Sequence, residues 1–347
     1  MTERTRFCLI GCGGIGIWHI KAVSEIPGAE LVAVADVNEK QMNRVVRRFR
    51  IPAAFTDYKE MYDKVEPDVA LIATPVFLHA PMTIEAAGRG INVLCEKPIS
   101  RNLDEAKAMV DACRKTGVHL SHMNNWRHAE VVQRVVEIME SEKVGPIHSM
   151  YMSYASPGSE YLSPGMGEWV YDKEKAGGGV LLDSGYHSVD VINYLFGEIK
   201  TVSAEVATLV KQGNVDDIAL IVFQNEKGLL GMLKLSWIEH TPMDQAGACV
   251  KLYGTRGLID VQLQHSIITV TTRDPRLVIE MVDTSDLMVK PGYVGHRLKI
   301  ANFLAVMRGD DEARERDIDE LLRVAATLEA VYQSAAEGKR VKVSSLL

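Results

Sequence analysis

The fold of the N-terminal part is decided by residues 6–16, which read RFCLIGCGGIG. The apolar run up to Ile10 predicts a short strand, which continues directly into a G-x-G-x-x-G pattern and then a helical pattern. Glycines in such a turn let the backbone approach a pyrophosphate, which the free N–H groups at the start of the helix then hold. We therefore expect a dinucleotide-binding Rossmann fold whose turn contacts the cofactor through Gly11, Gly13, Gly14, Ile15 and Gly16.

An acidic residue at the end of the next predicted strand adds a second signal. Asp36 directly follows the strand-like run Glu30–Ala35 and lies 20 residues beyond Gly16. A carboxylate at this place bonds the hydroxyls of the adenine ribose and repels a 2′-phosphate. The sequence therefore favours NAD(H) over NADP(H). Three arginines on the following predicted helix, at positions 44, 47 and 48, keep NADP(H) open as the less favoured cofactor.

Short apolar runs alternate with helical patterns through the first 124 residues. The predicted strands are Arg6–Ile10, Glu30–Ala35, Val69–Ala73, Asn92–Cys95 and Val118–His122. The predicted helices between them include Asn38–Phe49, Ala80–Gly88 and Leu103–Lys115. Apolar strands that alternate with helices are typical of a parallel sheet covered on both faces. We expect residues 1–124 to form an α/β, doubly wound NAD(P)-binding Rossmann domain.

The pattern changes after about residue 125. A helix, a strand, a long loop rich in glycine and a second helix are predicted at Ala129–Lys143, Ile147–Tyr154, 155–179 and Val180–Phe196. Seven strand-like segments then follow one another between residues 201 and 282, before a last helical region, His296–Glu337. Consecutive strands without helices between them indicate a mostly antiparallel sheet. We expect residues 125–347 to form an α+β domain, with a large open sheet, for substrate binding and oligomerisation.

The composition is that of a packed globular protein. The chain has 347 residues, of which 47% are hydrophobic and 24% charged, and its net charge is −7. This charge gives no electrostatic reason to bind nucleic acid or an anionic membrane, and no apolar run reaches the roughly 18–20 residues that span a bilayer. Five dispersed cysteines without a C-x-x-C pair indicate reduced thiols, no metal site and a cytoplasmic location.

Four segments of the sequence together resemble the Gfo/Idh/MocA family, the group of glucose–fructose oxidoreductase and inositol dehydrogenase. They read GCGGIGIWH at 11–19, ATPVFLH at 73–79, EKP at 96–98 and GGGVLLDSGYHSVD at 177–190. Their order and spacing cover most of the chain. The resemblance implies an active site between the two domains and a sugar, polyol or cyclitol substrate that reacts at a secondary alcohol. It also implies a homodimer or homotetramer, for which the open face of the second sheet is the expected surface.

Three residues within these segments have the chemistry that alcohol oxidation with NAD⁺ requires. Lys97 follows a predicted strand end, where an ammonium can stabilise a developing alkoxide. Asp183, His187 and Asp190 are spaced to lie on one face of a predicted helix, and histidine titrates near neutrality. The resemblance implies that Asp183 binds a substrate hydroxyl and that His187 transfers the proton. Asp190 is expected either to orient the imidazole and contact substrate or to serve the structure.

Further site residues are predicted with an alternative beside each. Thr74, Pro75, His79, Glu96 and Lys97 match segments that line the nicotinamide part of the cofactor pocket, although His79 is equally suited to begin the next helix. The Lys97–Pro98 bond is a candidate for the cis form.

Candidate substrate contacts beyond these segments lie at the domain junction and in the long loop. Asn125 and Arg127 fall at the junction, and a structural ion pair is the alternative for Arg127. Trp169 and Tyr161 lie in the loop, where an aromatic face can stack on a sugar ring or simply pack locally.

The leading hypothesis is an NAD(H)-dependent oxidoreductase that acts on a secondary alcohol of a sugar, polyol or cyclitol. The first alternative is a redox-neutral enzyme that uses bound NAD⁺ transiently to cleave a glycosidic bond. The second alternative is a regulator that senses NAD without catalysis. The intact set of Lys97, Asp183 and His187 favours an enzyme over a regulator.

Overall fold

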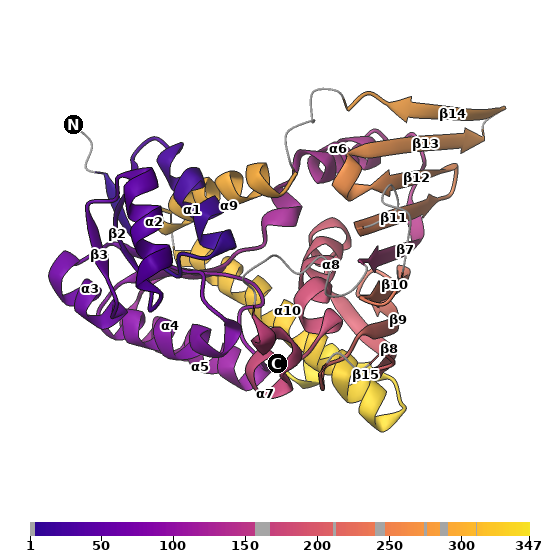
Figure 1. Cartoon of the computed structure of the whole chain (residues 1–347). Helices are drawn as coiled ribbons and strands as arrows, with labels where there is room; N and C mark the ends of the chain where they lie inside the picture. The colour runs from indigo at the N-terminus through magenta and orange to yellow at the C-terminus, as the bar shows by residue number, and fades with distance from the viewer. Residues whose placement is uncertain are drawn as a thin grey trace.

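Two β-sheets, each with its own helices, make up the structure (Figure 1). This computed structural model describes residues 4–156, 167–210, 213–239, 247–273, 276–284, 291–309 and 311–347. The first sheet has six strands in the order β3-β2-β1-β4-β5-β6, and the second has nine in the order β14-β13-β12-β11-β7-β10-β9-β8-β15. The predicted fold class, a doubly wound α/β domain joined to an α+β domain with a large, mostly antiparallel sheet, is confirmed.

All neighbouring strands of the first sheet are parallel. Its strands are β1 Thr5–Ile10, β2 Ala29–Ala35, β3 Ala53–Phe55, β4 Val69–Ile72, β5 Asn92–Cys95 and β6 Leu120–His122. The five predicted strands are all present. Strand β3 was not predicted, because it has three residues and none of them is buried, so it lacks the apolar run that marks the others.

Three of the five helices that the structure describes in the first domain begin at a residue whose side chain caps them. The five are α1 Gly14–Ser24, α2 Glu39–Phe49, α3 Tyr58–Val65, α4 His79–Gly88 and α5 Leu103–Thr116, and the capped ones are α2, α3 and α5. The side chains of Asn38 and Asn102 accept backbone N–H groups at the starts of α2 and α5, which is the usual N-cap contact. Helix α5 ends at Gly117, whose φ of 74° lies in the left-handed region that glycine adopts most easily.

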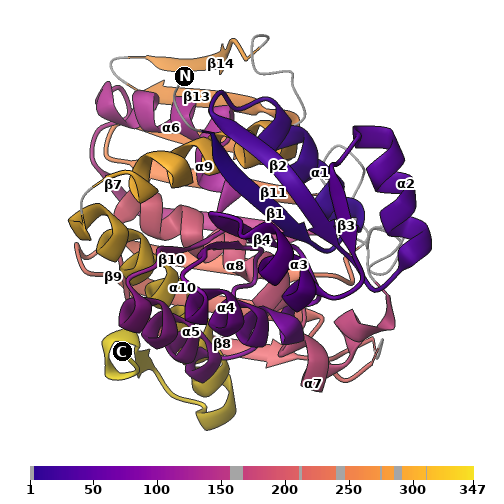
Figure 2. The same ribbon diagram turned by 90° about the vertical axis from the view of Figure 1, so that its left-hand side faces the viewer.

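The side chains of β1 alternate between two apolar layers, as a sheet covered on both faces requires. Phe7 and Leu9 belong to the layer that contains buried residues of α1 and α2, whereas Cys8 and Ile10 belong to the layer of α3, α4 and α5. Figure 2 shows α1 and α2 on one side of these strands and α4 and α5 on the other.

A helix from the end of the chain completes the first of these layers. Helix α9, Pro291–Met307, lies beside α1 (Figure 1). Three of its buried side chains join the cluster of Phe7 and Leu9, namely Ile300, Phe303 and Leu304. The C-terminal part of the chain therefore returns to the N-terminal sheet and supplies part of its cover.

The predicted helical region His296–Glu337 consists of two helices, α9 and α10, the latter spanning Asp311–Glu337. Gly309 lies between them, where the backbone leaves α9 through a turn in which its N–H donates to the carbonyl of Val306. Among the residues that the structure describes, no helix has both the length and the apolarity needed to cross a membrane.

The second sheet has one covered face and one open face. Its strands are β7 Ile147–Ala155, β8 Ile199–Ala207, β9 Ile218–Asn225, β10 Leu230–Ser236, β11 Gly247–Gly254, β12 Gly257–Gln262, β13 Ile267–Arg273, β14 Leu277–Val282 and β15 Val341–Lys342. Strands β7 and β10 are parallel, and the other neighbours are antiparallel. Helices α6 (Glu130–Glu140), α8 (Val180–Phe196) and α10 pack on one face. The opposite face exposes apolar side chains that include Leu220, Val222, Leu230 and Met232.

Candidate active site

The candidate site lies where the carboxyl ends of β1, β4 and β5 approach helix α8. Gly11 follows β1, Thr74 lies just beyond β4, and Glu96 follows β5. Strand order reverses between β1 and β4, which places a crevice there. Open α/β sheets bind their ligands in this crevice, outside the carboxyl ends of the strands.

Two glycines of the turn after β1 have no room for a side chain. Gly11 has a φ of +100°, and a Cβ added to it would lie 2.3 Å from the carbonyl oxygen of Ala73. A Cβ on Gly16 would lie 2.1 Å from the carbonyl oxygen of Gly11. Gly13 and Gly14, by contrast, face open space. Because α1 begins at Gly14 without a side-chain cap, its first N–H groups fit an incoming phosphate. Next to them Ile15 is 40% exposed.

Asp36 lies next to this turn, as the sequence predicted. Its carboxylate accepts the N–H of Cys12 at 2.6 Å and the N–H of Asn38 at 2.7 Å. The Gln41 amide donates to the carbonyl of Cys12 at 2.9 Å, which fixes the turn from a second direction. The carboxylate is thus held half-buried at the end of β2, and its role as a ribose ligand stays a prediction.

His79 connects the loop after β4 to the turn after β5. Its Nε2 lies 2.9 Å from the carbonyl oxygen of Thr74, and its Nδ1 lies 3.0 Å from that of Pro98. Burial lowers the pKa of His79, and both ring nitrogens are engaged by the backbone. His79 is also the first residue of α4, as the alternative interpretation expected. Pro75 precedes the short 3₁₀ helix Val76–Leu78, and the Lys97–Pro98 peptide bond is cis, which confirms that prediction.

Glu96 points back into the protein and anchors the segment that carries Lys97. Its Oε1 accepts from Nε2 of His19 at 2.7 Å, and its Oε2 accepts the N–H of Lys97 at 2.9 Å. Burial alone raises the pKa of Glu96, but hydrogen bonds from His19 and His296 outweigh it and hold the pKa well below its usual range. The three side chains also place atoms of metal-ligand type within 4.8 Å of one another, with Nε2 of His296 at 3.7 Å from Oε1 of Glu96. His19 and His296 were not among the predicted site residues.

Lys97 and Asp183 form an ion pair across the domain junction. Nζ of Lys97 lies 2.6 Å from Oδ1 of Asp183, and the two side chains are 19% and 28% exposed. Burial alone lowers the pKa of Lys97, but the charge of Asp183 outweighs it, so the net pKa is raised. Lys97 is therefore an ammonium at neutral pH, in a position that solvent and a small ligand can reach.

His187 lies one helical turn beyond Asp183 on α8. Burial, and next the positive charge of Lys97, lower the pKa of His187 well below its usual range, so the imidazole is neutral near pH 7. The ring stacks on the indole of Trp126, with the ring centroids 4.4 Å apart and the planes at 2°. Trp126 was not predicted, although it stands between the two candidates Asn125 and Arg127.

Arg127 and Asp190 bind each other, and both side chains are buried. Nε of Arg127 donates to Oδ2 of Asp190 at 2.9 Å, and its Nη2 donates to Oδ1. The Arg127 side chain is 8% exposed and that of Asp190 is 1% exposed, and Glu320 accepts a further bond from Arg127. The structure thus shows the ion pair that was the alternative for Arg127. It places the Asp190 carboxylate on Arg127 and not on His187.

Asn125 is also buried, and its amide lies 3.3 Å from Nδ1 of His296. Trp169 lies in the short 3₁₀ helix Glu168–Tyr171 and meets Phe77 edge to face, with the centroids 6.3 Å apart. It lines a small pocket beside Asp183. Tyr161 lies outside the described residues.

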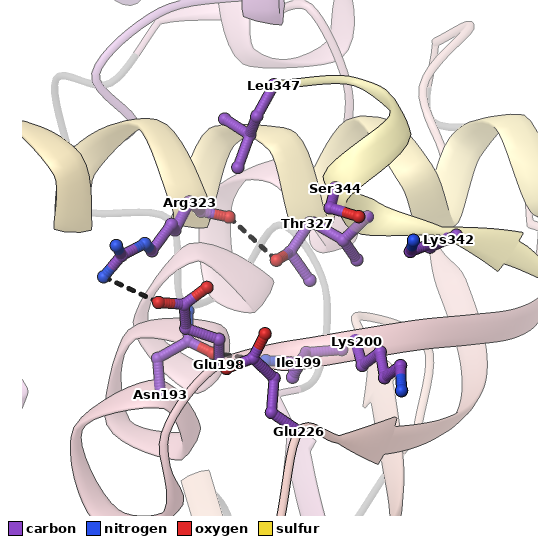
Figure 3. Close-up of a pocket in the computed structure, with 11 residues that line it drawn as sticks. Asn193, Glu198, Ile199, Lys200, Glu226, Arg323, Thr327, Lys342, Ser344 and Leu347 are labelled. Atoms are coloured by element: carbon purple, nitrogen blue, oxygen red, sulfur yellow. Dashed lines mark hydrogen bonds and ion pairs between the residues drawn. The ribbon is translucent and has the colours of Figure 1, made fainter.

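A second cavity lies away from this site, between the end of α8, strand β8, α10 and the end of the chain (Figure 3). An ion pair of 2.9 Å between Arg323 and Glu198 crosses its wall. The residues predicted for the active site are not among those that line it. The cavity is therefore separate from the Lys97 region.

Two family models match the chain in succession. The "Oxidoreductase family, NAD-binding Rossmann fold" matches residues 5–141, and the "GFO/IDH/MocA C-terminal domain" matches residues 132–260. The chain is 25% identical to a D-apiose dehydrogenase of Paraburkholderia graminis, over 99% of this chain and 91% of that protein. It is 27% identical to the myo-inositol 2-dehydrogenase of Thermotoga maritima, over 73% of this chain and 74% of that protein.

A solved structure shares the fold over the whole chain. It is an oxidoreductase from Agrobacterium radiobacter in complex with NAD⁺, L-tartaric acid and magnesium. It superposes with a TM-score of 0.85 at 23% identity, over 99% of this chain and 100% of that one. The match to the NAD-binding family confirms the predicted cofactor, NAD.

Proposed function

The chain belongs to the GFO/IDH/MocA oxidoreductase family, and on that premise we propose that it moves a hydride between a secondary alcohol carbon and NAD. The proposed substrate class is a sugar, polyol or cyclitol. One observation carries the proposal: the Lys97 ammonium, which follows β5, pairs with Asp183 of α8, and its charge helps keep the imidazole of His187, one turn further along that helix, neutral. The relatives named for D-apiose and myo-inositol support the substrate class.

Each of the three side chains then has one task. In the oxidation direction the Lys97 ammonium donates a hydrogen bond to the reacting oxygen and stabilises the alkoxide as it forms. The neutral His187 takes the hydroxyl proton as general base. Asp183 holds Lys97 in place and accepts a bond from a second substrate hydroxyl. NAD, when bound, supplies the acceptor for the hydride and its electron pair, so the proton and the hydride leave the substrate separately.

The glycine turn and Asp36 are the proposed cofactor contacts. Gly13 and Gly14 leave open space above the first N–H groups of α1, which fits a pyrophosphate. Asp36, which accepts the N–H of Cys12, is proposed also to bind the adenine ribose. Thr74, Pro75 and the Glu96–Lys97 segment are proposed to line the nicotinamide part of the cofactor pocket.

We also propose the domain division at residue 124 and a homodimer or homotetramer formed through the open face of the second sheet. Apolar side chains of β9 and β10 are exposed there, as in surfaces that bind a partner. Free thiols at all five cysteines favour a reducing, cytoplasmic setting.

The test is reduction of NAD⁺ and NADP⁺, followed by absorbance, with a panel of inositols, free aldoses including D-apiose, and sugar acids. The proposal expects turnover with NAD⁺ and at least one of these alcohols. If no compound of the panel reduced either cofactor while the protein still bound NADH tightly, the result would contradict the proposal. That result would favour the redox-neutral glycoside-cleaving enzyme or the NAD-sensing regulator.

A further inference from the structure

The imidazole of His187 is oriented in an unusual way. Its Nδ1 is buried and finds no hydrogen-bond partner among the residues that the structure describes. In a histidine that transfers protons, the bond made by the second ring nitrogen normally sets the orientation and the tautomer. Here the ring instead lies flat on Trp126, with the planes 2° apart and the centroids at 4.4 Å.

The ion pair of Arg127 and Asp190 fixes the position of the Trp126 indole relative to the His187 imidazole. Trp126 and Arg127 are neighbours in the short 3₁₀ helix Asn125–His128. Asp190 lies three residues after His187 on the same face of α8. Arg127 holds Asp190 through two hydrogen bonds. Because Trp126 directly precedes Arg127, this pairing places the indole over the imidazole of His187, one turn before Asp190 on α8.

Two further contacts limit the movement of this segment. The amide of Asn124 donates to Oδ1 of Asp190 at 3.4 Å. The indole of Trp126 also meets Tyr154 of β7, with the centroids 6.0 Å apart. The indole therefore lies between the imidazole of α8 and Tyr154 of the second sheet.

On the basis of the proposed function, we propose that Trp126 is the positioning residue for His187. Its indole holds the plane of the imidazole so that a ring nitrogen faces the reacting hydroxyl, and the Arg127–Asp190 pair holds the indole. Proton transfer requires heavy atoms about 2.6–3.2 Å apart, and a misplacement of about 1 Å costs roughly 10²-fold in rate. The flat face of the indole thus orients the catalytic imidazole, a task that a hydrogen-bonded carboxylate performs in other sites.

The kinetic test compares Trp126→Leu with Trp126→Phe in the full chain, assayed with NAD⁺ and with D-apiose and myo-inositol as first probes. Trp126→Leu should lower kcat by about 10- to 100-fold and leave KM and NADH binding nearly unchanged. Trp126→Phe keeps an aromatic plane and should recover most of the loss. In a His187→Gln background, Trp126→Leu should cause no further loss, because both changes remove the same function.

A second measurement needs no substrate. In the NADH-bound protein labelled with ¹³C-histidine, the His187 ring signal is identified by its loss in His187→Gln. Stacking on the indole should shift that signal upfield, Trp126→Leu should abolish the shift, and Trp126→Phe should keep part of it. If Trp126→Leu does not fold, as judged by lost NADH binding, the comparison of wild type with Trp126→Phe decides.

The outcomes separate this inference from the proposed function. Full activity of His187→Gln would refute the proposed role of His187. Loss of activity in His187→Gln, with kcat of Trp126→Leu unchanged, would overturn only the positioning role. An equal loss from Trp126→Leu in both backgrounds, or a His187 signal that is the same with and without the indole, would overturn it as well.

Discussion

One face of helix α8 carries two ion pairs of the same chemical kind, two turns apart, with opposite exposure. At the start of the helix, Asp183 meets Lys97, and both side chains are partly exposed at 28% and 19%. Two turns later, Asp190 meets Arg127, and both are almost completely buried at 1% and 8%. A partly open pair can exchange its partner for a substrate, whereas a buried, bidentate pair can only hold two elements together. Residue type alone therefore does not tell a reactive pair from a structural one.

The largest expected difference between the two pairs is in turnover. Lys97→Met should lower kcat/KM by about 10²–10³-fold, because one donor to the developing oxyanion is lost. Folding and NADH binding should persist, since the side chain is partly exposed. Steady-state kinetics and thermal melting measure both quantities, with Lys64→Met as the control on an exposed i,i+4 pair. If Lys97→Met kept full activity, the exposed pair would be structural too.

The second largest difference is in stability. Asp190→Asn leaves the buried Arg127 with Glu320 as its remaining carboxylate partner and should cost about 3 kcal/mol, the lower end of the range for a broken buried pair. The matched change Asp183→Asn breaks the exposed pair and should cost about 0–1 kcal/mol. Urea unfolding of the two variants compares them directly. Equal destabilisation by the two changes would remove the distinction between the partly exposed pair and the buried pair.

Acidification is expected to lower the stability of the folded protein through two histidines near the buried Arg127–Asp190 pair. Burial lowers the pKa of His122 to about 3 and that of His128 to about 4, from an ordinary value of 6.5. Both are neutral when folded and become protonated in the unfolded chain below pH 6.5. Their contribution to stability is therefore complete above pH 6.5 and is lost as the pH falls toward 4. Thermal melting between pH 7.5 and 4.5 should show a fall in Tm that is less steep in His122→Phe, and an unchanged slope would count against this account.

The smallest expected effect concerns the cofactor and lies away from α8. Asp36→Asn removes the charge that repels a 2′-phosphate and should raise the ratio of NADP(H) to NAD(H) use by about 10-fold, which corresponds to about 1.4 kcal/mol. Comparing kcat/KM for the two cofactors measures the ratio. Asp311→Asn, at a carboxylate whose side chain is 98% exposed, serves as the control for a general charge effect. A ratio that does not move would show that Asp36 serves only to fix the turn.

The same comparison shows what the sequence could predict. The bounds of α8 were predicted correctly, because an apolar run between Gly179 and Gly197 marks both ends. The spacing of Asp183, His187 and Asp190 also placed all three on one face, and each one meets a side chain from residues 97–127. Periodicity shows which residues share a face.

Which side chains pack against a given face of a helix depends on contacts between segments far apart in the chain. Arg127 and Asp190 are 63 residues apart, and the pattern of neither segment encodes the other. Trp126 was not predicted for the same reason. It lies in a short 3₁₀ helix whose sequence shows no hydrophobic periodicity, so no local pattern marks it as a site residue. The His19–Glu96–His296 cluster and the return of α9 to the first sheet depend on such contacts as well.

The return of α9 to the first sheet has a consequence for synthesis of the protein. On the ribosome, β1 emerges first, but Ile300 and Phe303, which complete its layer with Phe7 and Leu9, come near the end of the chain. At about 5–20 residues per second, the nascent first domain waits roughly ten seconds or more with that part of its apolar layer uncovered. Chaperones that shield such surfaces during translation are therefore expected to determine the yield of folded protein.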